Sequence, residues 1–320
     1  MIARVVLMAW AALVLPAAAI AEDYPNRTIR LIVGFPPGGN VDAVARVLAQ
    51  DMTKGLGQPV VVDNKSGVQG SLAAELVARS PADGYTLLVV SGAHPVNAAI
   101  YKSLSYDSVN DFDWISIATS YPFAISVRGA SPVKSLKELL AAAKAKPGTV
   151  SNGSSGPGSV LFMTTELLGS VAGVKFLEVA YKGEAPALTA ALAGEVDCVV
   201  TTTTAVVPHI GTGALRPLAV TSKTRWKDLP DVPTVTETGI PGVEVTSWTG
   251  LAAPHGTPRP VVERLNQELH RVIALPDVRA RLESFGGEVR GNSPDEMKAQ
   301  VAGEVARWTK VVQEAGIERQ

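Results

Sequence analysis

Short runs of apolar, mostly β-branched residues alternate along the chain with segments whose apolar residues recur at a helical spacing. Such runs are typical of buried strands, and strands separated by helices predict parallel sheets with helices on both faces. We therefore expect an α/β fold. The predicted strands are Ile29–Val33, Val60–Val62, Thr86–Val90, Ile115–Ala118, Phe123–Val127, Thr149–Ser151, Phe176–Val179, Val196–Val200 and Leu215–Val220.

The predicted helices carry recognisable start signals. Ser135 with Glu138, and Ser293 with Glu296, have the spacing of a capping box, and Pro294 stands at a first helical position. The helix after the first strand has an apolar face made of Val41, Val44, Ala45, Leu48 and Met52. The C-terminal helices are predicted at Pro260–Ala274, Pro276–Ser284 and Pro294–Ala315.

The number of strands predicts two α/β lobes, because it exceeds what one compact sheet holds and no segment repeats at a fixed period. The C-terminal helices need a surface to cover, so we expect them to pack back on the first lobe. The predicted lobes are residues 22–121 together with 248–320, and residues 122–247. The chain would then cross between lobes twice, near residues 120–124 and 246–253.

The N-terminus has the features of a secretory signal peptide. Arg4 is followed by an apolar run over residues 5–15, and Ala19-Ile20-Ala21 forms a cleavage site of the A-x-A type. A membrane anchor is the alternative, but the run is short for a spanning helix and Pro16 follows it. We expect residues 1–21 to be removed and the mature protein to be periplasmic.

Charge and cysteine content narrow the function further. The chain has 29 Lys and Arg against 30 Asp and Glu, without basic blocks, which argues against nucleic acid as a partner. Cys198 is the only cysteine, so an internal disulfide is excluded and a buried apolar role is expected. The four histidines lack metal-ligand spacing, so we expect no metal and no cofactor. We expect a monomer.

The segment "GFPPGGN", at the join between the first strand and its helix, predicts an anion site. The first turn of a helix has unpaired N–H groups and a partial positive charge. Gly38 and Gly39 leave this backbone open, and the two prolines stiffen the approach. Asp42 would repel an anion, so we assign it a capping or lobe-packing role. A tight turn that binds nothing is the alternative for this loop alone.

Four more loops follow predicted strands, and together they predict a cleft between the lobes. They cover residues 151–159, 91–97, 181–187 and 201–208. His94 is either a ligand contact or a residue of a helix start, and Lys182 is either a surface lysine or a ligand ion pair. The candidate binding residues are Phe35, Gly38, Gly39, Asn40, Ser91, Ala93, His94, Ser154, Ser155, Gly156, Ser159, Tyr181, Lys182, Gly183, Thr202 and Thr203.

No catalytic signature stands in these loops, since the chain lacks a G-x-S-x-G, H-E-x-x-H, C-x-x-C or phosphate-loop pattern. The first hypothesis is accordingly a binding protein. An enzyme on the same architecture remains the alternative, with Ser155, His94 or Asp42 as catalytic groups.

Several segments resemble one family over almost the whole mature chain. They include "YPNRTIRLIVGFPPGGNVDAVARVLAQ", "GQPVVVDNKSG", "ADGYTLLVV", "LPDVPTVTETGIPG" and "TSWTGLAAPHGTP", in the family's order. The chain is similar to the Bug-type, or TctC-type, solute receptors of tripartite tricarboxylate transporters. The resemblance implies a type II periplasmic-binding-protein fold, whose two lobes close on a ligand across a two-crossing hinge.

The resemblance also implies a function and a site. It implies capture of a small carboxylate (a dicarboxylate, an amino acid or an aromatic acid) and its delivery to a membrane permease, with a sensor protein as a further partner. Loops at Phe35–Asn40 and Ser154–Ser159 would hold a carboxylate, together with ordered water. The chain departs from the family where Asn40 replaces a common Thr, where "SVLFM" lacks a frequent His, and where "TTTT" replaces a stretch that often carries Asp or Asn.

Overall fold

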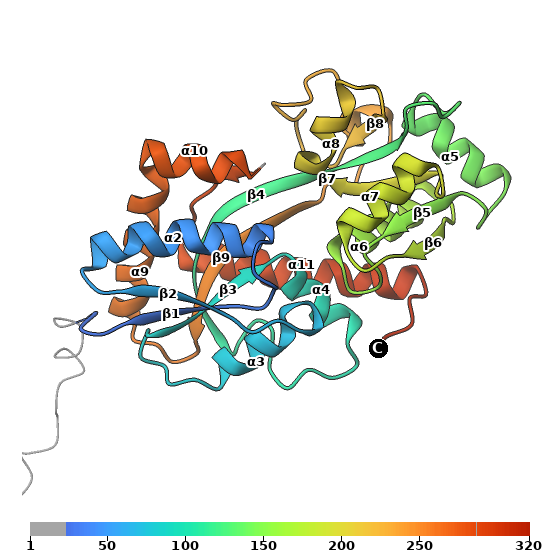
Figure 1. The fold of residues 1–320 in the computed structure, drawn as a ribbon. Helices are drawn as coiled ribbons and strands as arrows, with labels where there is room; N and C mark the ends of the chain where they lie inside the picture. The colour runs from blue at the N-terminus through green and yellow to red at the C-terminus, as the bar shows by residue number, and fades with distance from the viewer. Residues whose placement is uncertain (1–23, 286) are drawn as a thin grey trace, which may run out of the picture.

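The computed structural model describes residues 24–285 and 287–320 (Figure 1). The predicted signal peptide lies outside the described residues. The strands form one curled mixed sheet in the order β2-β1-β3-β9-β4-β7-β5-β6, and β8 and β10 also pair with β4. The strands are β1 Ile29–Val33, β2 Val60–Asn64, β3 Thr86–Ser91, β4 Phe112–Arg128, β5 Ser151–Ser154, β6 Leu177–Ala180, β7 Cys198–Thr202, β8 Leu215–Val220, β9 Thr246–Pro254 and β10 Glu288–Val289.

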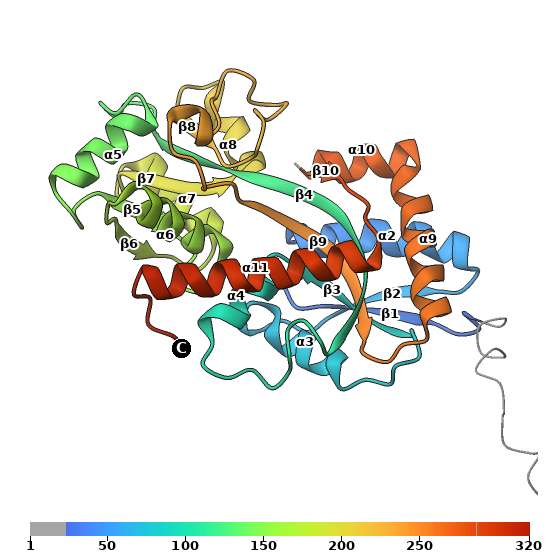
Figure 2. The same cartoon turned by 180° about the vertical axis from the view of Figure 1, so that it is seen from behind.

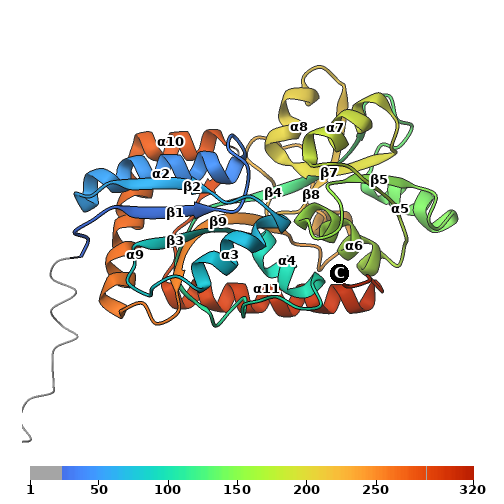
Figure 3. The ribbon, with the colours of Figure 1, turned by 60° about the horizontal axis from the view of Figure 1, so that its bottom comes forward.

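The N-terminal half of the sheet carries helices on both faces, as the alternating pattern predicts. β1 pairs in parallel with β2 and β3, and its apolar residues are almost completely buried. One face packs on α2 (Asn40–Leu56), α9 (Arg259–Ala274) and α10 (Pro276–Ser284). The other face packs on α3 (Ser71–Ala78), α4 (Ala93–Ile100) and α11 (Pro294–Glu314). Figure 3 shows these layers from below.

The second half of the sheet repeats this arrangement. β5 pairs in parallel with β6 and β7. Helices α5 (Leu136–Ala145) and α6 (Val160–Ala172) cover one face, and α7 (Glu184–Ala193) and α8 (Thr203–Ile210) cover the other. Cys198 is buried and free, as expected. The prediction of purely parallel sheets is wrong, because β4, β8 and β9 run antiparallel to their neighbours.

β4 is one continuous strand of 17 residues that passes from one half of the sheet to the other (Figure 1). The sequence predicted two strands with a break near Pro122. Pro122 lies opposite Thr246 of β9. One segment of β4 pairs with β10 and a later segment pairs with β7, and Pro122 lies in the gap between these two segments, so the strand can continue. The missing N–H of Pro122 therefore removes no ladder hydrogen bond. The predicted second crossing, near residues 246–253, is also a strand, β9.

Helix α11 runs along both halves of the sheet and lies in front of it in Figure 2. Its N-terminal part buries Met297 and Val301 in a cluster with Trp248. Its C-terminal part buries Trp308 in a different cluster that contains Phe123 and helix α6. The helix thus packs on both halves rather than on the first alone. The residue boundaries of the two lobes remain a prediction.

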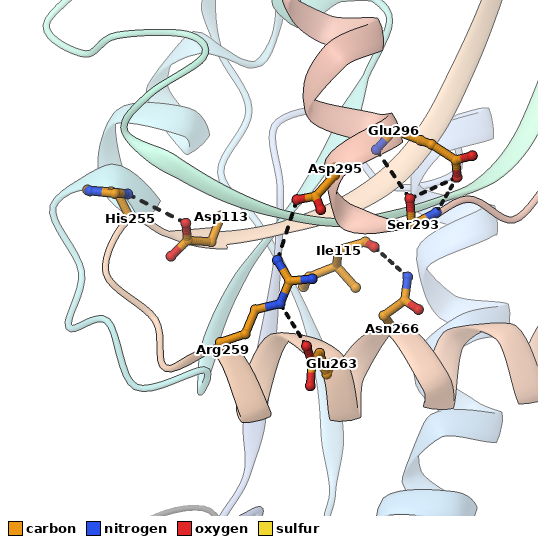
Figure 4. A network of polar contacts seen from close by, with 9 residues as sticks. All are labelled: Asp113, Ile115, His255, Arg259, Glu263, Asn266, Ser293, Asp295 and Glu296. Carbon is orange, nitrogen blue, oxygen red and sulfur yellow. Dashed lines mark hydrogen bonds and ion pairs between the residues drawn. The ribbon is translucent and has the colours of Figure 1, made fainter. Parts of the chain in front are cut away.

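Side chains near the N-terminus of α11 attach it and α9 to the sheet (Figure 4). Ser293 and Glu296 form the predicted capping box. Asn266 of α9 donates its side-chain amide to the carbonyl oxygen of Ile115 at 2.7 Å. Arg259 pairs with Glu263 of its own helix and with Asp295 of α11. Within residues 24–285 and 287–320, no helix combines the length and the apolar character that crossing a membrane requires.

We expect Thr221→Val to weaken the hinge. The buried Thr221 hydroxyl donates to the Val245 carbonyl oxygen at 2.6 Å and accepts from the Phe123 N–H at 2.9 Å, so it connects β8, β4 and the start of β9. Leaving these groups unpaired should lower the free energy of unfolding by about 1–3 kcal/mol, measured by urea denaturation. The matched substitution Thr309→Val on α11 should change it far less. Equal stability of the wild type and Thr221→Val would contradict the assigned role.

Candidate ligand-binding site

The loop before α2 leaves part of its backbone unpaired, but fewer donors than the sequence suggested. Gly38 has a φ of +88°, which only glycine adopts easily, whereas Gly39 has an ordinary φ of −77°. The Gly38 N–H donates to the Asp42 carboxylate at 2.9 Å and is not free for a ligand. The N–H groups of Gly39, Asn40 and Val41 have no acceptor in the described part of the chain. They are the open donors of this helix start.

Asp42 fixes the shape of this loop. Its buried carboxylate accepts hydrogen bonds from Gly38, from Arg46 Nε at 2.9 Å and from Asn64 Nδ2 at 2.9 Å. These partners, Arg46 foremost, lower the pKa of Asp42 to about 2 despite its burial. Asp42 therefore holds the turn before α2 and does not cap the helix itself, because Gly39, the N-cap residue, has no side-chain cap hydrogen bond. The same hydrogen bonds leave it poorly suited to act as a general base.

The loop before α6 likewise has glycines with positive φ values and side chains that hydrogen-bond to its own backbone. Gly156 and Gly158 have φ values of +85° and +88°, so both positions favour glycine. Ser154 Oγ accepts from the Gly156 N–H at 3.3 Å, and Ser159 Oγ donates to the Gly156 carbonyl oxygen at 2.8 Å and accepts from the Phe162 N–H. These two hydroxyls therefore hold the loop itself. Ser155 is half-buried, and its hydroxyl has no hydrogen bond to another described residue.

A buried polar cluster lies beneath this second loop. Asn152 donates to both carboxylate oxygens of Glu178 at 3.1 Å and to the Thr165 hydroxyl at 3.1 Å. Burial raises the pKa of Glu178 to about 7. Burial likewise raises the pKa of the Cys198 thiol, so this cysteine is unreactive at neutral pH. The cluster supports the floor of the loop rather than offering a nucleophile.

His94 belongs to an aromatic cluster, and its reading as a catalytic group is wrong. Its ring stacks on Tyr106 and meets Phe112 and Trp114 edge-on. Its Nε2 lies 2.9 Å from the Ser108 carbonyl oxygen. Burial lowers the pKa of His94 to about 4, so the ring is neutral at physiological pH. The residue lies at the start of α4, as one of the two sequence interpretations held.

A small cavity of about 10 Å³ adjoins the first loop, at the ends of β1 and β3. Its walls include Phe35, Gln69, Ser91, His94 and Asn97. The volume is that of a single water molecule, and the buried Oδ1 of Asn97 has no partner among the described residues. Ser91 Oγ accepts from the Ala93 N–H at 3.4 Å, so the hydroxyl proton of Ser91 can still donate to another group. An ordered water fits this place.

The loop at residues 181–187 is hydrogen-bonded to the loop before α6, and the loop at residues 201–208 is hydrogen-bonded to residue 184. The Tyr181 N–H donates to the Ser154 carbonyl oxygen at 2.9 Å, and the Thr202 N–H donates to Glu184 Oε1 at 2.5 Å. Thr202 caps α8, which replaces most of the loop predicted at 201–208. Thr203 is buried at the first position of this helix.

Lys182 is an exposed surface lysine, and Gly183 has a φ of +115°.

Contacts across the hinge bring the loops of both halves together. The Phe285 carbonyl oxygen accepts from Asn40 Nδ2 at 3.1 Å and from Thr204 Oγ1 at 3.3 Å. A Cβ placed on Gly158 would lie 3.8 Å from Gln69 Cγ and 3.9 Å from Tyr101 Oη. Phe285 therefore links the loops that follow β1 and β7, and the loop that follows β5 lies beside Gln69 and Tyr101 of the first half.

Sequence reasoning missed the residues that link these loops. Gln69 has a φ of +52°, unusual for a residue other than glycine, and its carbonyl oxygen accepts from Asn97 Nδ2 at 3.1 Å. In the sequence, the position of Gln69 between Gly67 and Gly70 was the one sign that its backbone could be unusual. Glu184 had a weaker signal, as an acid at a helix start. Phe285 and Tyr101 had none, because their roles depend on the packing of α10 and α4.

Comparison with known proteins identifies the family. Residues 44–317 match the family model described as TctC, the tripartite tricarboxylate transporter family receptor. The protein BugT of Bordetella pertussis is 35% identical over 94% of this chain and 93% of its own length.

Two solved structures are close in fold and sequence. The R. palustris protein Rpa4515, solved with adipate, has a TM-score of 0.81 and 37% identity over 92% of this chain and 99% of its own. MatC of Rhodopseudomonas palustris, solved with bound malate, has a TM-score of 0.78 and 34% identity over 90% of this chain and 100% of its own. The type II periplasmic-binding-protein fold and the family resemblance read from the sequence are confirmed. The chain belongs to the TctC family, the solute receptors of tripartite tricarboxylate transporters.

Proposed function

We propose that this chain is a periplasmic receptor that captures a small carboxylate between its two lobes and delivers it to a membrane permease. The binding groups are proposed to be the open N–H groups at the start of α2 and the loop before α6, with Ser155 and an ordered water beside Ser91. The observation that carries the proposal is that each loop is in contact with the opposite half: Asn40 and Thr204 share the Phe285 carbonyl oxygen, and Gly158 lies beside Gln69 and Tyr101. Relatives solved with adipate and malate support a ligand with carboxylate groups.

Backbone donors suit this ligand because the two loops at Phe35–Asn40 and Ser154–Ser159 contain no arginine or lysine. A helix N-terminus supplies several N–H groups and a partial positive charge without a counter-ion that must be displaced. The three open N–H groups before α2 can accommodate one carboxylate oxygen or its bridging water. A second carboxylate would then meet the loop before α6. This geometry favours a short dicarboxylate over a large ligand.

The proposed mechanism is differential binding by two conformations. Each lobe alone contacts part of the ligand, and only the closed form contacts all of it, so the ligand shifts the equilibrium toward closure. Two contacts across the hinge would form or break when the lobes close. They are the hydrogen bond from Thr204 to the Phe285 carbonyl oxygen and the ion pair between Lys227 and Glu283 at 3.7 Å. The permease would recognise the closed surface, and a sensor protein is an alternative partner.

A binding role is favoured over catalysis by the state of the candidate catalytic groups. Ser155 has no histidine or carboxylate within hydrogen-bond distance among the described residues, so nothing activates its hydroxyl. His94 is neutral and buried in an aromatic cluster, and Asp42 is saturated with hydrogen bonds. The relatives are receptors. We infer that this chain is likewise a receptor, monomeric and exported by cleavage after Ala21.

We expect Gly39→Leu to abolish binding while the protein still folds. The backbone φ of −77° suits any residue, and a Cβ at this position meets only the Pro36 carbonyl oxygen, at 3.7 Å. The leucine side chain would cover the open N–H groups. A thermal-shift screen of short dicarboxylates should raise the Tm of the wild type, since ligands that bind only the folded state stabilise it. Gly39→Leu should show no shift.

Gly211→Leu is the matched control, because Gly211 is exposed, has a φ of −60° and has open space around its Cβ position. It should keep the full ligand-induced shift. Undiminished affinity in Gly39→Leu would contradict the assignment of this loop. Recovery of a chemically altered ligand after denaturation would contradict a receptor role.

We expect Asp42→Asn to destabilise the protein in a pH-dependent way. The pKa of Asp42 is about 2 in the folded protein against an ordinary 3.8, so the paired carboxylate stabilises the fold above about pH 4. This contribution is lost as the pH falls through about 2. Near pH 7, Asp42→Asn should lower the free energy of unfolding by about 2 kcal/mol, and the difference from the wild type should shrink between pH 4 and pH 2. The exposed Asp228→Asn is the control, and a pH-independent difference would contradict this reading.

A further inference from the structure

Glu184 places a carboxylate among groups that are otherwise suited to bind anions. It is the first residue of α7, in the loop predicted at residues 181–187. The Thr202 N–H donates to Glu184 Oε1 at 2.5 Å, so the carboxylate lies at the end of β7, beside the start of α8. β7 pairs in parallel with β5, and the loop before α6 follows β5, so both strand ends meet at one edge of the sheet. Glu184 therefore lies beside the proposed binding site.

The hinge strands connect Glu184 to the first half of the molecule. Tyr121 of β4 lies opposite Ser247 of β9, and both strands pass from one half to the other (Figure 3). Burial raises the pKa of the Tyr121 phenol, and the nearby carboxylate of Glu184 raises it further. A Cβ on Gly92, directly after β3, would lie 2.9 Å from Ser247 Oγ. Polar groups thus follow the hinge from Gly92 in the first half to Glu184 in the second.

No cation of the described chain balances the Glu184 carboxylate. Thr202 is the only described residue that hydrogen-bonds to it, and Lys182 nearby is exposed and forms no ion pair with it. Burial raises the pKa of Glu184, because loss of solvent penalises the charged form. A carboxylate has about four acceptor positions, so acceptor capacity remains. A ligand group with positive charge and N–H donors would stabilise this acid.

Asp42, the acid at the other helix start, is in a different state. It pairs with Arg46 at 2.9 Å and accepts from Gly38 and Asn64, and these partners lower its pKa to about 2. The chain itself therefore balances Asp42, whereas it leaves Glu184 without a cation.

Support of helix α8 does not account for Glu184. A carboxylate at a helix start can stabilise that helix alone. However, Thr202 already caps α8, because its hydroxyl accepts from the Ala205 N–H at 3.4 Å. The helix thus has a side-chain cap without Glu184.

We propose that Glu184 selects a ligand with an ammonium group beside one of its carboxylates, namely a short amino dicarboxylate. This inference rests on the proposed function and adds the third group of the ligand. The open N–H groups before α2 and the loop before α6 would take the carboxylates, and Glu184 would take the ammonium group. A dicarboxylate without an ammonium group leaves Glu184 unbalanced and brings further negative charge toward it, so it binds more weakly.

Isothermal titration of the mature protein with two pairs of acids tests this inference. L-aspartate and succinate differ by one ammonium group, as do L-glutamate and glutarate. In at least one pair, the wild type should bind the amino acid at least about tenfold more tightly than the plain dicarboxylate. Glu184→Gln should bring this ratio close to one, because glutamine keeps an oxygen for the Thr202 N–H and loses the charge. A residue that only supported α8 would affect both acids alike and leave the ratio unchanged.

Glu195→Gln is the matched control, because Glu195 is exposed and lies just beyond the other end of α7. It should keep the wild-type ratio. A wild type without a preference in either pair, or a ratio that Glu184→Gln leaves unchanged, would overturn this inference and leave the proposed function standing. Binding of none of the four acids would overturn the inference together with the preference for short dicarboxylates.

Crystals of the wild type with the preferred amino acid give a second test, which decides the question if Glu184→Gln fails to fold. An ammonium nitrogen about 2.7–3.2 Å from a carboxylate oxygen of Glu184 supports the inference. An ammonium group that contacts other residues and not Glu184 overturns it.

Discussion

The hydrogen-bonded pair of strands β4 and β9 is the constraint on which the rest of the molecule depends. β4 pairs with β9 and β10 in one half of the sheet, and with β7 and β8 in the other. The loops at the ends of β1 and β3 are therefore held opposite those after β5 and β7. Helix α11 packs behind both halves and limits their separation. Asn40 and Thr204, which lie far apart in sequence, consequently donate to the same carbonyl oxygen, that of Phe285.

Some backbone N–H groups at these helix starts have no acceptor in the described chain, and others are used by the chain's own structure. Asp42 takes the Gly38 N–H, and Ser159 takes the Phe162 N–H. Both side chains lie within their own helix starts, where they fix the loop shape that keeps the neighbouring N–H groups open. A binding loop rich in glycine would otherwise lose conformational entropy on closing around a ligand. The internal hydrogen bonds reduce that cost before the ligand arrives.

The fold was largely predictable from local patterns, because buried strands and amphipathic helices each have a characteristic period. The family resemblance added the two-lobe architecture. The continuous β4 was not predictable, since Pro122 normally interrupts a strand and is tolerated here only because of a gap between its neighbours. The candidate loops were found from their glycines. Gln69 and Phe285 were missed, and the roles of Ser154, Ser159 and Asp42 depend on hydrogen-bond partners that sequence spacing alone does not determine.

A crystal structure of the mature protein with a bound short dicarboxylate tests the central claim most directly. The account predicts a carboxylate oxygen, or one bridging water, about 2.7–3.2 Å from the N–H groups of Gly39, Asn40 or Val41, with the other end of the ligand against the loop before α6. A ligand held by charged side chains away from both helix starts would contradict it.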